Sequence, residues 1–227
     1  MKRIFFILTL IISGSIFAQE TETVEKTIGE FTELKVYDLI QLELVNSEEN
    51  KIVITGKNTE QVTINNKNGK LKIKMNIEKL FNGNDTKVTL YYKHIDVIDV
   101  NEGAQITSDD VIKQFEIDLR AQEGATISVP VDVKHTLVKS VTGGIITVTG
   151  TSKDQNIDIN TGGVFKGEAL ITEDTDVSIK AGGEAYVNAT QEVNAKIRAG
   201  GDVYIYGRPE VINENTALGG SVKRMDK

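Results

Sequence analysis

The sequence predicts an all-β chain wound into a β-solenoid with a period of about 19–20 residues. Two observations predict it: glycine-centred turns recur at nearly constant spacing, and apolar residues recur at fixed offsets from those turns. The turns begin at Gly103, Gly124, Gly143, Gly162, Gly182, Gly200 and Gly219, at intervals of 21, 19, 19, 20, 18 and 19 residues. Self-similarity at one fixed period of this size indicates a repeat architecture.

Apolar columns accompany the turns. One lies three residues after each first glycine and comprises Ile106, Ile127, Ile146, Phe165, Ala185, Val203 and Val222. Another lies five residues before the glycine and comprises Ile98, Leu119, Val138, Ile157, Val177 and Ala195. Polar and apolar residues alternate around these columns, as in strands with one buried face. Each period therefore holds two strands and a tight turn, in which glycine adopts a positive φ at little cost.

Two all-β arrangements fit this alternation. Successive strands could pair through hairpins in an up-and-down antiparallel design, or each period could be one coil of a solenoid. Hairpins do not require position-by-position likeness from one pair to the next, whereas stacked coils do, so the columns favour the solenoid. Six intervals would then rise ~29 Å at the usual spacing between strands.

The first half of the chain repeats the pattern less regularly. Expected strands there span residues 34–36, 41–45, 51–55, 61–64, 70–75 and 87–92. Turn-rich stretches at 65–69 and 81–85 separate them, and the former is either a hairpin or a coil corner. We predict one elongated domain over 27–225, with regular repeats in 101–225 and with 27–100 serving partly as a cap.

The N-terminus has the features of a secretory signal peptide over residues 1–18. Lys2 and Arg3 precede the apolar run 4–12, and cleavage is expected after Ala18. The alternative is a retained membrane anchor, but this run is short for a bilayer. We expect a flexible segment at 19–26 and an exported chain in the periplasm, on the outer surface or outside the cell. The chain has no cysteine, so it has neither disulfides nor a lipidated cysteine.

The charge balance limits the partners. Removal of residues 1–18 leaves 24 basic residues (26 minus Lys2 and Arg3) against 33 acidic ones, a net charge of −9. Such a balance argues against nucleic acid and against anionic lipid surfaces as partners. No second hydrophobic segment follows, so no membrane insertion is expected after cleavage.

Three features together resemble a known family. They are the segment at residues 31–36, the repeated Gly-Gly or Gly-Ala turns, and residues 206–209 followed by 219–221. The chain resembles the putative auto-transporter adhesin, head GIN-domain family of exported proteins over nearly all of its mature length. That resemblance implies a right-handed parallel β-helix-like fold with likeness to pectin lyases, a role in adhesion, and no catalytic residues. The turns at 142–144, 161–163, 181–183 and 199–201 are Thr-Gly-Gly or Ala-Gly-Gly here, where the family pattern is Ser-Gly-Ala-like.

The residues themselves give no catalytic, cofactor-binding or metal-binding motif. The two histidines, His94 and His135, are far apart and have no cysteine beside them. The sequence has no nucleophile elbow, phosphate loop, dinucleotide fingerprint or calcium-binding nonapeptide. We therefore expect no enzyme, no cofactor and no bound metal.

Two carboxylates give the first candidate for a ligand-binding site. Glu184 and Asp202 follow successive turns and are expected to stack about 5 Å apart. Such a pair requires a cation, a shared proton or nearby bases. It is either a calcium-ligand or acid/base pair, or part of a surface charge ladder with Lys180 and Arg198, which is the interpretation we favour.

Two tyrosines give the second candidate. Tyr186 and Tyr204 are expected to stack in the next outward column, as ordinary cross-strand stabilisation or as a platform for sugar rings. Thr107, Ser128 and Thr147 continue that column, which fits a flat polar face better than a pocket.

Three functional hypotheses follow. The leading one is an exported, non-enzymatic binding or adhesion module that presents a repetitive surface to a polysaccharide or protein at the cell envelope. The second is a carbohydrate-active enzyme that uses Glu184 and Asp202. The third is a structural envelope protein that forms a homo-oligomer through its terminal coils.

Overall fold

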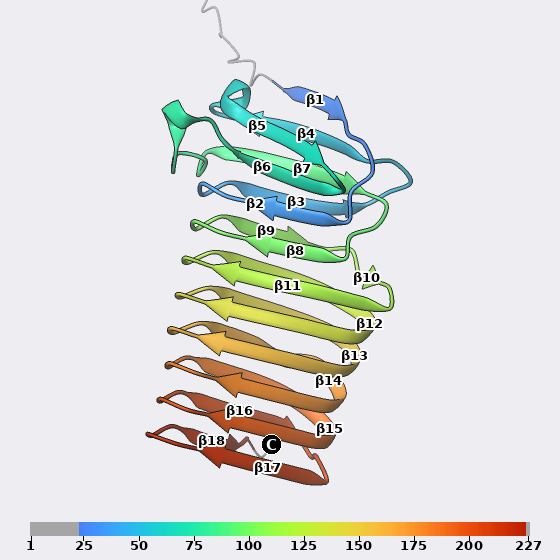
Figure 1. Cartoon of the computed structure of the whole chain (residues 1–227). Helices are drawn as coiled ribbons and strands as arrows, with labels where there is room; N and C mark the ends of the chain where they lie inside the picture. The colour runs from blue at the N-terminus through green and yellow to red at the C-terminus, as the bar shows by residue number, and fades with distance from the viewer. Residues whose placement is uncertain (1–22, 226–227) are drawn as a thin grey trace, which may run out of the picture.

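The computed structural model describes residues 23–225, which form a parallel β-solenoid of about seven turns (Figure 1). This architecture confirms the predicted fold class. The signal peptide predicted at residues 1–18 lies outside the described residues. Within the described chain, no helix is long and apolar enough to cross a membrane.

Eighteen strands and two short 3₁₀ helices are formed by residues 23–225. In the N-terminal part these are β1 (Val24–Thr27), β2 (Glu33–Val36), β3 (Gln41–Asn46), β4 (Lys51–Gly56), η1 (Thr59–Gln61), β5 (Val62–Lys67), β6 (Lys70–Met75), η2 (Ile77–Lys79) and β7 (Thr86–Tyr92). The rest comprises β8 (Val97–Val100), β9 (Gln105–Ser108), β10 (Ile112–Lys113), β11 (Glu116–Gln122), β12 (Thr126–Val141), β13 (Ile145–Asn160), β14 (Val164–Ile179), β15 (Glu184–Ile197), β16 (Asp202–Gly207), β17 (Val211–Thr216) and β18 (Ser221–Arg224).

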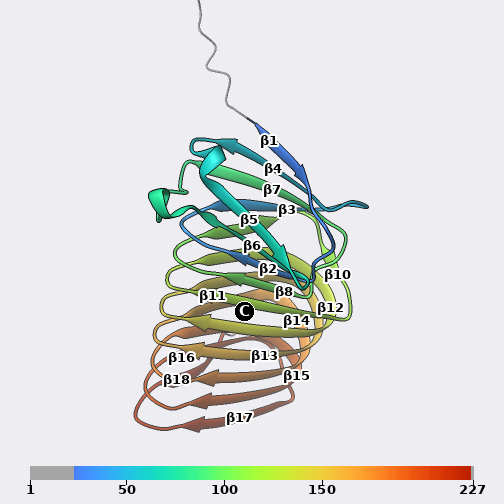
Figure 2. The same ribbon diagram turned by 45° about the horizontal axis from the view of Figure 1, so that its top comes forward.

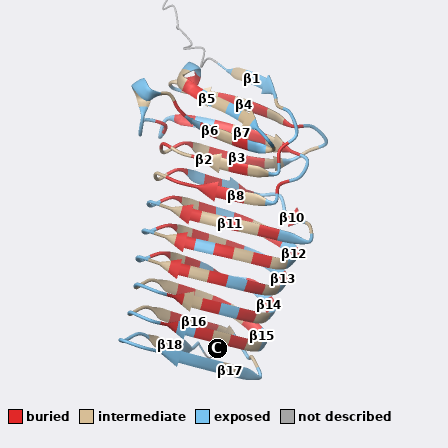
Figure 3. Ribbon diagram, in the orientation of Figure 1, coloured by how far each residue is buried: buried red, intermediate tan, exposed pale blue. Residues whose placement is uncertain are grey.

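Each regular coil has two faces. After a glycine turn the chain runs along one side of the solenoid, bends at a corner and returns along the other side to the next turn (Figures 1 and 2). We call the side before the turn the front face; it holds β11, the second halves of β12–β15, and β17. The back face holds β9, the first halves of β12–β15, β16 and β18. Apolar side chains from both faces fill the space between them, and buried residues recur along the strands of both faces (Figure 3).

The residues of each predicted apolar column pair with one another from one coil to the next. The column that follows the glycines pairs residue for residue from Ile106 to Val222, and the column before them pairs from Ile98 to Ala195. The strand pairing follows the sequence columns because a shift of one residue in the pairing would turn every buried side chain outward. Phe165 lies in the first column beside Ala185, so a large residue is followed by a small one in the next coil.

The first coils do not follow chain order. The coil made by β2 and β3 lies between the β8–β9 coil and the β6–β7 coil, with parallel pairing on both sides. Three antiparallel pairings close this end: β4 with β7, β1 with β4, and β5 with β6. Residues 65–69 are therefore the turn of a hairpin, one of the two arrangements the sequence left open.

Strand β1 begins within the segment that the sequence analysis described as flexible, residues 19–26. Val24 pairs with Ile54 and Thr27 with Lys51, so these residues cover the outer edge of β4. The N-terminal end of the solenoid is thus protected by a strand that carries no glycine repeat.

At the C-terminal end of the solenoid, charged side chains protect the open strand edge from pairing with another strand. Glu214 and Arg224 occupy positions that Ala195 and Ile205 fill with apolar side chains in the coil above. They border the open space between the two faces of the last coil, which Figure 3 shows as largely exposed. Inward-pointing charges of this kind discourage another strand from adding to an open edge.

A partly buried charge network lies on the front face of the N-terminal coils. The Lys35 Nζ atom lies 2.5 Å from an Asp99 carboxylate oxygen and 3.3 Å from a Glu33 oxygen. Burial alone would raise the pKa of Asp99, but the hydrogen bond and charge of Lys35, with amides from Asn101 and Gln122, lower it overall. These contacts satisfy a carboxylate that is only 4% exposed.

Candidate functional site

The two tyrosines predicted to stack do so on the back face. Tyr186 pairs with Tyr204, and their ring centroids lie 4.6 Å apart with an interplanar angle of 11°. Lys223 lies over the other side of Tyr204, with Nζ 4.8 Å from the ring centroid. Because Tyr204 is covered on both sides, its ring face is not free to stack against a sugar.

The two carboxylates beside the tyrosines also pair in register, and each accepts hydrogen bonds from a different partner. Glu184 accepts a hydrogen bond of 2.8 Å from the Tyr186 hydroxyl, which raises the pKa of Tyr186 to about 12. Asp202 accepts a hydrogen bond from the Ser221 hydroxyl and lies 3.4 Å from Lys223 Nζ. Ser221 first, and then Lys223, lower the pKa of Asp202. Neither arrangement resembles a pair of carboxyls that share a proton.

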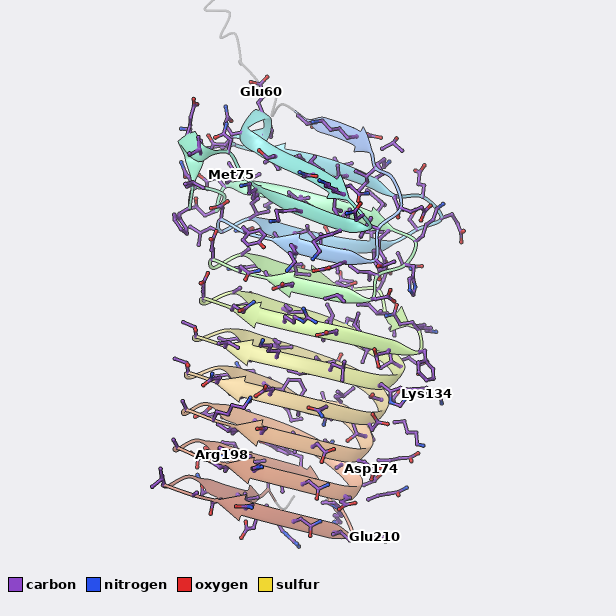
Figure 4. The ribbon with its side chains drawn as sticks, in the orientation of Figure 1. Glu60, Met75, Lys134, Asp174, Arg198 and Glu210 are labelled. Atoms are coloured by element: carbon purple, nitrogen blue, oxygen red, sulfur yellow. The ribbon has the colours of Figure 1, made fainter. Side chains whose placement is uncertain are left out.

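The predicted charge ladder is corrected by the structure. Lys180 directly follows the front-face end of β14, and its ammonium lies 2.8 Å from Asp158 of the preceding coil. Arg198 is exposed at the equivalent place one coil further on (Figure 4). Both precede the glycine turn, whereas Glu184 and Asp202 follow it on the back face, so the turn separates the basic residues from the acidic pair. The base that compensates Asp202 is Lys223, from the following coil.

The front face carries a polar column that the sequence analysis did not identify. Its members are paired in register and are Asn156, Asp176, Asn194 and Asn213. Asn156, Asp176 and Asn194 each lie one position before a member of the apolar column that precedes the glycine turns. The sequence period that predicted the core therefore also contained this polar column. Two residues further on, a parallel column carries Asp158, Ser178, Lys196 and Asn215.

These two columns border a shallow groove of about 350 Å³ on the front face, which we call the asparagine groove. Its lining residues are Asn156, Asp176, Val177, Ser178, Asn194, Ala195, Lys196, Asn213, Glu214 and Asn215. Equivalent groups in neighbouring coils are about 4.8 Å apart, the spacing of paired strands. The groove therefore presents polar, hydrogen-bonding side chains at a regular interval along the solenoid axis, although their chemical type differs from coil to coil.

Most polar groups of the groove are available to a ligand. Asn213 donates to Asn194 at 2.9 Å and to Glu192 at 2.8 Å, which fixes the orientation of its amide. Within the described chain, the side chains of Asn156, Asp176 and Lys196 make no hydrogen bond or ion pair. An amide, a carboxylate and an ammonium together offer both donors and acceptors.

Among the described residues, no three His, Asp or Glu side chains are placed to hold a metal ion. His135 Nδ1 lies 2.8 Å from Asp154, and His94 Nε2 lies 2.6 Å from Asp96. Each histidine thus has one carboxylate partner, His135 on strand β12 and His94 in the connection between β7 and β8.

The fold and these faces define a repetitive β-solenoid with a polar, hydrogen-bonding surface. Residues 30–209 match the family described as putative auto-transporter adhesin, head GIN domain, and the chain belongs to this family. A search of curated proteins finds no match.

Several solved structures share the fold. A putative adhesin from Bacteroides fragilis is 16% identical, with a TM-score of 0.83, and the match covers 92% of this chain and 98% of that one. A putative adhesin from Parabacteroides distasonis is 17% identical, with a TM-score of 0.73 and coverage of 91% and 97%. A protein from the same species, described as a putative lipid binding protein, is 20% identical, with a TM-score of 0.68 and coverage of 92% and 98%. At these identities the likeness concerns the fold alone.

Proposed function

We propose that this protein is an exported, non-enzymatic binding module that holds a polysaccharide chain in the asparagine groove. The observation that carries the proposal is a regular row of polar side chains along one shallow groove, in which an amide, a carboxylate and an ammonium lack partners among the described residues. Membership of an adhesin family supports a binding role and a place at the cell surface.

The chemistry of the groove favours a sugar polymer over a protein. Protein interfaces depend on a few aromatic or arginine anchors that fill pockets. The residues that line the groove include neither, and they offer amides, acids, a hydroxyl and an amine instead. Sugar hydroxyls both donate and accept hydrogen bonds, so a polymer of repeating units can meet a hydrogen-bonding side chain at each coil.

The tyrosines and carboxylates of the back face then have a stabilising role. Tyr186 is bonded to Glu184, and Tyr204 lies between Tyr186 and Lys223. A glycosidase needs one carboxyl group that stays protonated and another that is ionised. Glu184 and Asp202 are both partly exposed, and each accepts a hydrogen bond from a neighbouring hydroxyl, so neither lies in the apolar pocket that keeps a general acid protonated.

A glycan array followed by calorimetry tests the proposal. The mature chain should bind at least one neutral or amine-bearing polysaccharide. Asn156→Ala combined with Asp176→Ala should lower its affinity by roughly tenfold, as expected from the loss of hydrogen bonds of ~1 kcal/mol or slightly less each. Tyr186→Phe on the back face is the matched control and should bind as the wild type does. Equal losses in both variants, or hydrolysis of the bound polymer, would contradict the proposal.

A further inference from the structure

The loop between β6 and β7, residues 76–85, exposes three large apolar side chains. Ile77 is 85% exposed, Phe81 59% and Leu80 48%. The loop projects from the N-terminal end of the solenoid, at the upper left of Figures 1 and 3. Three apolar side chains within five residues form a concentrated apolar surface, unlike the single exposed residues found on most proteins.

A buried carboxylate holds this loop in place. Asp38 is 1% exposed, and its two carboxylate oxygens accept hydrogen bonds from the backbone N–H of Met75 at 3.0 Å and of Phe81 at 3.2 Å. The N–H of Gly83 donates to the Asp38 carbonyl at 3.0 Å. Phe81 has a φ of 55°, which is unfavourable for a bulky residue. The surrounding contacts therefore impose the conformation that turns these apolar side chains outward.

Lysines surround the apolar tip. Lys74 precedes the loop, Lys79 lies within it and Lys87 follows it, and none of the three forms an ion pair within the described chain. Residues 57–87 hold seven lysines and three acidic residues, a balance of +4. The whole chain carries −7, so the remainder carries −11 (−7 minus +4). The charge of this segment, which contains the loop and the strands on either side of it, is opposite in sign to that of the rest of the chain.

We propose that the loop docks this end of the solenoid on a phospholipid bilayer that carries anionic headgroups. Ile77, Leu80 and Phe81 enter the boundary between headgroups and acyl chains, while Lys74, Lys79 and Lys87 contact the phosphates. Peripheral membrane binding depends on these two contributions, apolar burial and attraction to anionic lipid. The net charge of the whole chain disfavours such a surface, but screening makes the local charge decisive at contact distance.

Vesicle co-sedimentation of the mature chain tests the docking site. The protein should bind vesicles of phosphatidylcholine with phosphatidylglycerol more tightly than vesicles of phosphatidylcholine alone, and added salt should weaken binding. The combined variant Ile77→Ser, Leu80→Ser and Phe81→Ser should bind at least tenfold more weakly, as expected for the loss of partly buried apolar area. Its thermal unfolding should be unchanged, because these side chains are exposed in the free protein.

Two further variants complete the test. Replacing Lys74, Lys79 and Lys87 with Gln should weaken binding and reduce its salt dependence. Phe115→Ser with Ile171→Ser is the matched control, because these side chains are 68% and 52% exposed at the far corner of the coils. Equal binding to both vesicle types, or equal binding by wild type and the triple serine variant, would overturn the proposal. Self-association of the wild type that the triple variant loses, without vesicle binding, would assign the loop to a protein contact instead.

Discussion

The turn at Gly143 and Gly144 offers a direct test of what the glycines contribute. Thr142 and Gly143 have φ values of 50° and 73°, as in a type I′ turn. A Cβ added to Gly143 would meet no atom within 4 Å. A Cβ added to Gly144 would lie 2.2 Å from the carbonyl oxygen of Ala121, in the neighbouring coil. The first glycine is therefore required by the turn, and the second by the contact between coils.

The two alanine variants should differ in stability. Gly143→Ala places alanine in the left-handed region and should cost about 1 kcal/mol, part of which is offset by the lower entropy of the unfolded chain. Gly144→Ala must push the coils apart and should cost about 3 kcal/mol or more. Urea unfolding at unchanged slope should show the larger effect as a midpoint ~1 M lower than that of the wild type.

Two outcomes would refute this reasoning. Equal midpoints for the two variants would mean that the coils can separate locally without loss of stability. A larger loss for Gly143→Ala would mean that turn geometry, and not the contact between coils, requires the glycine pair.

Three other predictions concern charges. Tyr186 should ionise near pH 12, and Glu184→Gln should bring its ultraviolet titration back towards about pH 10; an unchanged titration would contradict the hydrogen bond. Asp99→Ala removes the nearer of the two carboxylates beside Lys35 and leaves the Asn101 and Gln122 amides without this acceptor, so it should cost about 2 kcal/mol at neutral pH. The pKa of Asp99 is lowered in the folded state, so its contribution is lost as the pH falls below about 4, where the unfolding free energies of variant and wild type should converge. Glu214→Leu with Arg224→Leu should expose an apolar edge and cause association in light scattering, and a strict monomer would remove that role from the two charges.

The sequence predicted those parts of the fold that repeat. The column from Ile106 to Val222 pairs in register because each coil places an apolar side chain at the equivalent position. The order of the first coils was not predictable in this way. Alternation shows that β2 and β6 are strands, but several partners satisfy the same alternation, so it does not determine which strand lies beside which.

The candidate surfaces show the same limit. Stacking of Tyr186 on Tyr204 followed from the period, but the lysine that covers Tyr204 comes from an irregular last coil. The asparagine groove was missed although Asn156 and Asn194 obey the period, because polar residues on an outward face are also expected for simple solubility. Its distinguishing feature is the lack of partners for those side chains, which only the three-dimensional arrangement gives.

Side-chain amide NMR tests the central claim most directly, namely that the asparagine groove is the binding surface. With uniformly ¹⁵N-labelled protein, a bound polysaccharide should shift the amide NH₂ signals of Asn156, Asn194 and Asn215 on the front face. The signal of Asn188, on the back face beside the tyrosines, should stay in place. Shifts at Asn188 alone, or none at the groove under saturating polysaccharide, would contradict the account.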